Sequence, residues 1–146
     1  MNIHELDAIT HPELFARLTL DGEAPARLWA RGNVEALAAE RPALAVTGSR
    51  ASSGFGEHMA RELVNDLSRD MQLITGAAYG IEAAAVREAL GCGSPVVIIA
   101  ANGADRVHPA GHADLIERVA TAGGVILTEN EPGSAPPGPG SSAAGS

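Results

Sequence analysis

The sequence predicts a three-layer α/β fold with a mainly parallel sheet and helices on both faces. Four short apolar runs, rich in β-branched residues and without polar alternation, are typical of strands buried on both faces. They cover residues 44–47, 73–75, 96–100 and 125–128. Helical patterns separate the runs, and strands that alternate with helices form a parallel sheet through right-handed crossovers.

Three helices are expected between these strands, each from apolar residues that recur every three or four positions. The stripes are Phe55, Met59, Leu63 and Leu67; Ile81, Ala84, Ala85 and Ala89; and Leu115, Ile116, Val119 and Ala122. On the first helix the stripe would face the core, which would leave His58 and Arg61 on the solvent side.

The chain is expected to divide into three segments: an N-terminal helical and strand extension at residues 1–41, the Rossmann-like domain at residues 42–132, and a disordered tail at residues 133–146. Within the extension, residues 7–18 predict a helix, residues 28–30 a strand, and residues 34–40 a helix that ends before Pro42. The tail is low-complexity Pro, Gly, Ser and Ala, with almost nothing to bury.

The composition excludes several kinds of chemistry. The chain has 146 residues, a formal net charge of −8 and ten Lys+Arg residues, all of them Arg. Without lysine there is no Walker-type phosphate lysine, no Schiff base and no lysine general base. The single cysteine, Cys92, excludes an internal disulfide and a Cys-rich metal cluster. Because the chain is acidic, any binding of nucleic acid requires a local site rather than bulk charge.

Neither a membrane span nor a metal site is expected. No run approaches the ~20 apolar residues that cross a bilayer, and the N-terminus lacks the regions of a secretory signal, so we expect a cytoplasmic protein. One group of residues has side chains of the kinds that bind metal ions: Asp105, His108, His112 and Asp114. The loop around it offers no fixed face, so we expect no metal and no cofactor.

Glycine and other small residues follow three of the predicted strands. The candidate phosphate-binding residues are Gly48, Ser49, Arg50, Ser52, Gly54 and Gly56 after the first strand, Gly76, Ala77, Tyr79 and Gly80 after the second, and Gly103 after the third. Ligands of open α/β sheets bind beyond the carboxyl ends of strands, where glycine lets backbone amides approach closely. The first two turns also begin helices, whose amides and dipole attract anions. The sequence therefore predicts a phosphate site at this edge.

Several details of this site stay open. A dinucleotide site would need a G-x-G-x-x-G turn and an acidic residue at the end of the second strand. Here the glycines are spaced differently and the second strand ends in Thr75-Gly76, which disfavours a dinucleotide. Ser52 and Ser53 could bind phosphate or only cap the next helix. Tyr79 could stack a base or cover the core.

The motifs resemble the DNA-processing protein A (DprA/Smf) family over roughly residues 25–136. The matching segments are Gly48-Ser49-Arg50 with Ser52 and Gly56, residues 75–84, Gly103-Ala104-Asp105 with Pro109, and Thr128-Glu129 with Pro132-Gly133. The resemblance implies a Rossmann-like domain without a catalytic centre that grips the backbone of single-stranded DNA in natural transformation and recombination. It implies that Gly48, Ser49, Arg50, Ser52, Gly56, Gly76 and Gly80 line the DNA pocket.

The resemblance also implies RecA recombinase as a partner and a homodimer. In the family, an Arg-rich strand–helix segment follows the Pro-Gly turn and helps to form both surfaces, whereas here the tail follows. The chain further departs from the family at Tyr79, Glu82, Val86 and His108, where basic, Asp, His and Tyr residues are usual. We expect DNA binding, whereas, because of these departures, RecA loading and dimerisation stand only as what the resemblance implies.

Two other functions remain open beside DNA binding. The same turns could serve a nucleotide-binding sensor. They could also serve a nucleoside-monophosphate phosphoribohydrolase of a related Rossmann-like family, which needs a Pro-Gly-Gly-x-Gly-Thr turn near a glutamate. The chain has Gly123-Gly124 and Glu129 but lacks that turn, so we expect no enzyme.

Overall fold

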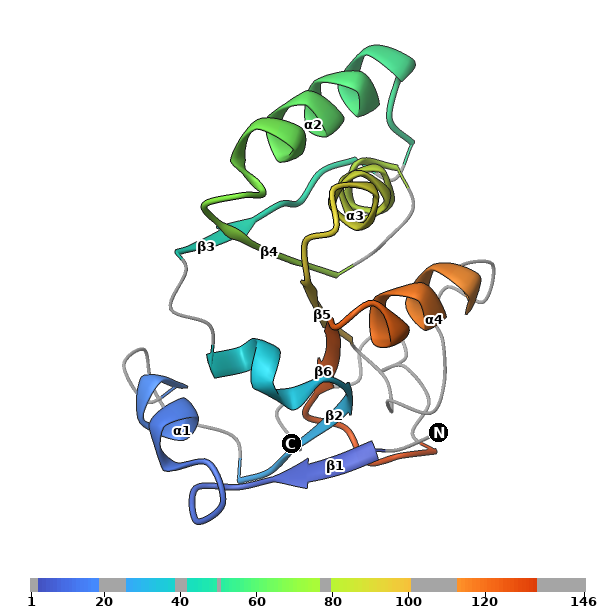
Figure 1. Cartoon of the computed structure of the whole chain (residues 1–146). Coiled ribbons are helices and arrows are strands. Elements are labelled where there is room, and N and C mark those ends of the chain that lie inside the picture. The colour runs from blue at the N-terminus through green and yellow to red at the C-terminus, as the bar shows by residue number, and fades with distance from the viewer. Residues whose placement is uncertain are drawn as a thin grey trace.

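The computed structural model describes residues 3–18, 26–38, 42–49, 51–76, 80–100 and 113–133. Figure 1 shows the elements in chain order: β1 (Ile3–Leu6), α1 (Pro12–Leu18), β2 (Leu28–Gly32), the 3-10 helix η1 (Val34–Ala38), β3 (Ala43–Ala45), α2 (Gly54–Leu67), β4 (Gln72–Thr75), α3 (Ile81–Gly91), β5 (Val96–Ile99), α4 (Ala113–Thr121) and β6 (Val125–Thr128). The four predicted strands and the three helices between them are confirmed.

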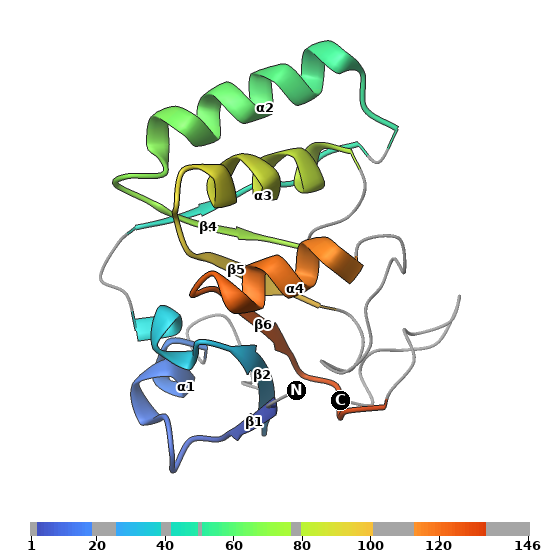
Figure 2. The same ribbon diagram turned by 45° about the vertical axis from the view of Figure 1, so that its right-hand side comes forward.

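All six strands form one sheet in the order β1-β2-β6-β5-β4-β3. Strands β3 to β6 are parallel, whereas β2 runs antiparallel to β6 and β1 antiparallel to β2. The mainly parallel sheet is therefore confirmed. Because β3 to β6 lie side by side in chain order, right-handed crossovers carry α2, α3 and α4 over the same face, as Figure 2 shows.

A hydrophobic core lies on each face of the sheet. One core joins α3 and α4 to the sheet through residues such as Val86, Val119 and Ile98, each at most 1% exposed. The other joins α1 and η1 to the sheet through Phe15 and Ala36. The prediction of helices on both faces is confirmed, with the longer helices on one face only.

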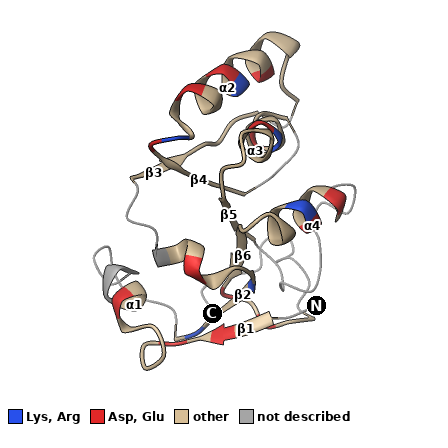
Figure 3. Cartoon of the chain, in the orientation of Figure 1, with Lys and Arg blue, Asp and Glu red and all other residues tan. Residues whose placement is uncertain are grey.

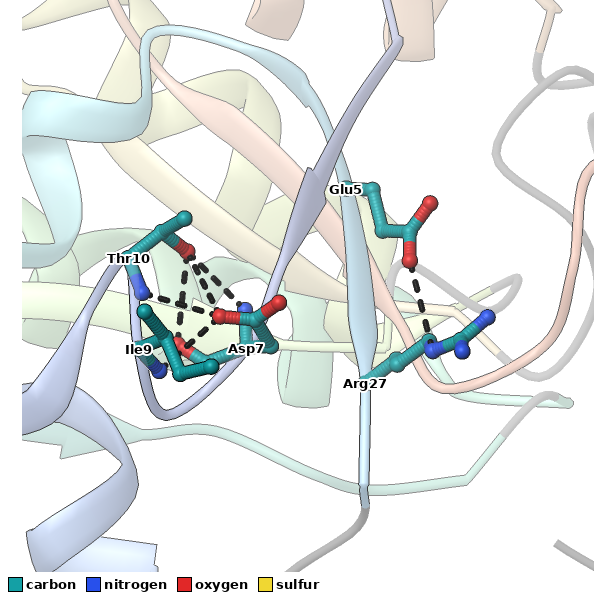
Figure 4. A network of polar contacts seen from close by, with 5 residues as sticks. All are labelled: Glu5, Asp7, Ile9, Thr10 and Arg27. Carbon is teal, nitrogen blue, oxygen red and sulfur yellow. Dashed lines mark hydrogen bonds and ion pairs between the residues drawn. The ribbon is translucent and has the colours of Figure 1, made fainter.

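The N-terminal segment differs from its prediction. Residues 3–6 form β1, and residues 7–10 form a tight turn instead of the start of a helix. Figure 4 shows how the Asp7 carboxylate accepts hydrogen bonds of 2.9 Å from the amides of Ile9 and Thr10. Such a side-chain bond offers the backbone an alternative to helix, so α1 begins only at Pro12.

The apolar stripe on α2 faces solvent, which contradicts the sequence prediction. Phe55 is 74% exposed, Met59 48% and Leu63 50%. Helix α2 packs against α3 with its opposite side, where Val64 is buried, so Arg61 is partly covered while His58 stays exposed. The physical reason is the position of β3 at the edge of the sheet. This strand is itself largely exposed, so the expectation of burial on both faces is wrong for β3.

Candidate functional site

The turn that follows β3 lies directly against the start of α3. The amide of Ile81 donates a hydrogen bond of 3.3 Å to the carbonyl of Ser49. A Cβ atom at Gly48 would lie 2.7 Å from the Cβ of Ile81, and one at Gly56 would lie 3.3 Å from its Cδ1. Figure 2 shows the starts of α2 and α3 on the same side of the sheet. The first two predicted turns therefore meet at one edge, as the sequence predicts.

Gly80, the N-cap residue of α3, has a backbone conformation that favours glycine. Its φ is 83° and its ψ is −124°, outside the regions that residues with side chains usually adopt. No side chain caps this helix start. The first amide of α3, that of Ile81, already donates to the carbonyl of Ser49, so it is not a donor for a ligand.

The start of α2 is capped by its own serines. Ser53 is the N-cap residue, and its Oγ accepts a hydrogen bond of 3.1 Å from the amide of Gly56. Ser52 instead donates its hydroxyl to Glu57 at 2.8 Å. The capping interpretation of Ser53 is confirmed. Gly54 and Phe55 are the first two residues of α2, so their amides have no acceptor within the helix and can donate to a ligand.

Two carboxylates border these donors. Glu57 lies in the first turn of α2 and Glu82 in the first turn of α3. An acidic side chain at this position is stabilised by the positive end of the helix dipole. Figure 3 shows acidic segments on both helices. Glu82 Oε1 lies 3.0 Å from the position of a Cβ at Gly76, which places it beside the turn after β4. An anion bound here would therefore need an arginine to offset these charges.

The structure describes seven of the eleven predicted site residues: Gly48, Ser49, Ser52, Gly54, Gly56, Gly76 and Gly80. Arg50, Ala77, Tyr79 and Gly103 lie outside the described residues. The predicted role of Arg50 in binding phosphate therefore stays a prediction, and the role of Tyr79 stays open.

Two exposed apolar residues beside the site were not predicted. Phe55 follows Gly54 in the first turn of α2 and is 74% exposed. Ile99 ends β5, is 49% exposed, and has its carbonyl 3.8 Å from the position of a Cβ at Gly76. Both belong to apolar patterns typical of a core, and the sequence carries no signal that separates them from buried neighbours.

Neither a metal cluster nor a membrane helix occurs in the described ranges. No three His, Cys, Asp or Glu residues among them are placed to hold a metal ion. Of the metal-like group considered from sequence, Asp105, His108 and His112 lie outside these ranges. No helix in the same ranges is both long and apolar enough to cross a membrane.

Known proteins are similar to this chain over most of its length. The family model for DNA recombination-mediator protein A matches residues 5–138. A putative DNA processing protein DprA from Mycobacterium tuberculosis is 41% identical over 122 residues, which covers 83% of this chain and 31% of the relative. The DNA processing protein DprA of Streptococcus pneumoniae is 30% identical over 78% of this chain and 39% of the relative. The chain thus spans about a third of the length of these relatives.

Solved structures show the same fold. The X-ray structure of DNA processing protein A from Streptococcus pneumoniae has a TM-score of 0.77 and 26% identity, and the match covers 93% of this chain and 47% of that one. DNA processing protein A from Helicobacter pylori, described with a single-stranded DNA binding mode, has a TM-score of 0.77 and 22% identity, over 93% of this chain and 59% of that one. The Rossmann-like domain is therefore confirmed, and the chain belongs to the DNA recombination-mediator protein A family.

Proposed function

We propose that this chain binds the sugar–phosphate backbone of single-stranded DNA at the edge formed by residues 48–56 and 76–82. Membership of a family of DNA recombination mediators supports the ligand. The Helicobacter pylori protein of the same fold, which is described with a single-stranded DNA binding mode, also supports it. No catalytic group is required, so we place the chain among binding proteins rather than enzymes.

The observation that carries the proposal is the bond between Ile81 and Ser49. This backbone bond of 3.3 Å holds together two glycine turns, each of which leads into a helix. The bond therefore brings the starts of two helices together, and the start of a helix favours an anion through its dipole and its first amides. A strand of DNA offers an array of phosphates, so it can contact both helix starts at once.

The site would bind without reading sequence, because contacts to the backbone carry no information about the bases. It would also depend little on salt, since each neutralised phosphate of a single strand adds only ~0.7 to the slope of log K against log salt. With Arg50 as the one predicted positive charge, we expect a slope of about −0.7. The family resemblance also supports two further proposals, which are binding to RecA recombinase and formation of a homodimer.

Fluorescence anisotropy with a labelled oligothymidylate tests the proposal. We expect Arg50→Glu to weaken binding by about ten-fold or more, because it replaces an attraction to phosphate by a repulsion. The matched control is Arg69→Glu, the same charge change at an exposed position beyond the other end of α2. Equal binding by wild type and Arg50→Glu would contradict the site assignment.

Titration with AMP separates the two alternative functions. A nucleotide sensor would bind AMP at least as tightly as the oligothymidylate, and a phosphoribohydrolase would release free adenine. We expect neither result, because a single phosphate occupies only one of the two helix starts.

A further inference from the structure

Among the described residues of the proposed DNA edge, Phe55 is the most exposed large apolar side chain. It is 74% exposed, whereas Phe15, another phenylalanine, is 4% exposed within the core. Burial of a phenylalanine is strongly favourable in water, so a ring that stands in solvent beside a ligand site is suited to a contact with that ligand.

The position of Phe55 ties it to the amides that would hold phosphate. It follows Gly54 in the first turn of α2, two residues after the N-cap Ser53. The amides of both residues have no acceptor within the helix. Nothing lies within 4 Å of a Cβ built at Gly54, so the space beside this turn is open. A nucleotide whose phosphate sat on these amides would have its base within reach of the ring.

We infer that Phe55 is the platform on which a base of the bound strand stacks, an inference that rests on the proposed function. A phenyl ring stacks on any base because every base has a flat π face. The ring would therefore add affinity without adding sequence preference, which matches a site that otherwise contacts only the backbone.

A docking surface for another protein is the competing explanation of this exposure. Phe55, Met59 and Leu63 form one apolar row on α2, and rows of this kind bind partner helices. The row is uneven, however: Met59 and Leu63 are each about half covered, and exposure is greatest at the end of the row that borders the glycine turns. The observations therefore favour a base over a protein.

The test compares two labelled probes of equal length, oligothymidylate and an abasic strand with the same number of phosphates. We expect Phe55→Ala to weaken binding of oligothymidylate by roughly five-fold or more and to leave binding of the abasic strand unchanged. Phe55→Trp, which keeps an aromatic face, should restore binding. Met59→Ala and Leu63→Ala serve as controls from the same row and should bind like wild type.

Each outcome decides the inference. If Phe55→Ala binds oligothymidylate like wild type while wild type binds well, stacking is overturned and the proposed function stands. If wild type binds neither probe, the proposed function and the inference fail together. If Met59→Ala and Leu63→Ala weaken binding as much as Phe55→Ala, or if both probes are affected alike, stacking is overturned. Circular dichroism of each variant confirms that the fold is retained.

Discussion

Gly48 and Ile81 pack as closely as the absence of a side chain allows. A Cβ at Gly48 would lie 2.7 to 2.8 Å from three side-chain atoms of Ile81. These atoms include the branched Cβ of Ile81, which cannot rotate out of the way. The close approach keeps the turn after β3 against the start of α3, so the proposed DNA site depends on glycine at this position.

Gly48→Ala is therefore expected to destabilise the fold by about 1–3 kcal/mol, the usual cost of forcing an extra methyl group into a packed region. Urea denaturation measures the loss. The matched control is Gly54→Ala, because nothing lies within 4 Å of a Cβ at that position. In the double variant Gly48→Ala/Ile81→Ala the two changes should compensate in part. A stability of Gly48→Ala equal to wild type would show that the two turns are not in contact.

Ser53 is expected to stabilise α2 through its N-cap bond to Gly56. Ser53→Ala should lower the free energy of unfolding by about 0.5–2 kcal/mol, whereas Ser53→Asn, which keeps a capping oxygen, should stay close to wild type. Thermal and urea denaturation of the three proteins check this. Equal losses from both substitutions would argue that the side chain acts through packing instead of capping.

Arg31 and Glu117 form an ion pair between β2 and α4. The Arg31 side chain is only 10% exposed, whereas that of Glu117 is 60% exposed. Glu117→Ala should cost about 1–2 kcal/mol, because it leaves a buried guanidinium without its acceptor. Arg31→Met should cost less, since the remaining carboxylate is solvated. The control Arg118→Ala changes an exposed neighbour on α4, and a loss from it as large as that from Glu117→Ala would refute the role of the pair.

The N-terminal turn should make stability depend on acid pH. The pKa of Asp7 lies below the ordinary aspartate value of 3.8, mainly because the Thr10 amide donates to its carboxylate. Since folding lowers this pKa, the charged form stabilises the fold above the unfolded pKa, and this contribution is lost as the pH falls through the folded pKa. Asp7→Asn keeps an acceptor oxygen and should remove that pH dependence. Carboxyl NMR titration that places the pKa of Asp7 at or above 3.8 would contradict this.

The sequence predicts the central part of the fold better than its edges. Strands β4, β5 and β6 are apolar and β-branched because neighbours cover them, so composition alone identifies them. Strand β1 has the sequence IHEL, whose polar residues carry no strand signal. It forms because it pairs with β2, a contact between segments far apart in the chain.

Helix α2 shows the limit of periodicity as a guide to burial. The spacing of Phe55, Met59 and Leu63 correctly predicts a helix, but it cannot say which neighbour the stripe meets. That depends on the order of strands in the sheet, which puts β3 at the edge.

The sequence indicates where the proposed site lies, but it does not indicate which backbone amides there can donate to a ligand. The rule that ligands bind beyond the carboxyl ends of strands selects this edge from the sequence, and the structure brings the turn after β3 and the start of α3 together there. Which amides are left unpaired depends on local bonds, such as the one that Ser53 accepts from Gly56. The structure places Gly54 and Phe55 as the first two residues of α2, where amides have no acceptor within the helix.

Mapping of backbone amide shifts during titration with oligothymidylate tests the central claim most directly. The account predicts that the largest changes in the NMR spectrum fall in residues 48–56 and 76–82, with the amides of Gly54 and Phe55 among them. Changes confined to the far edge of the sheet at β1 and β2, or no changes at all, would contradict it.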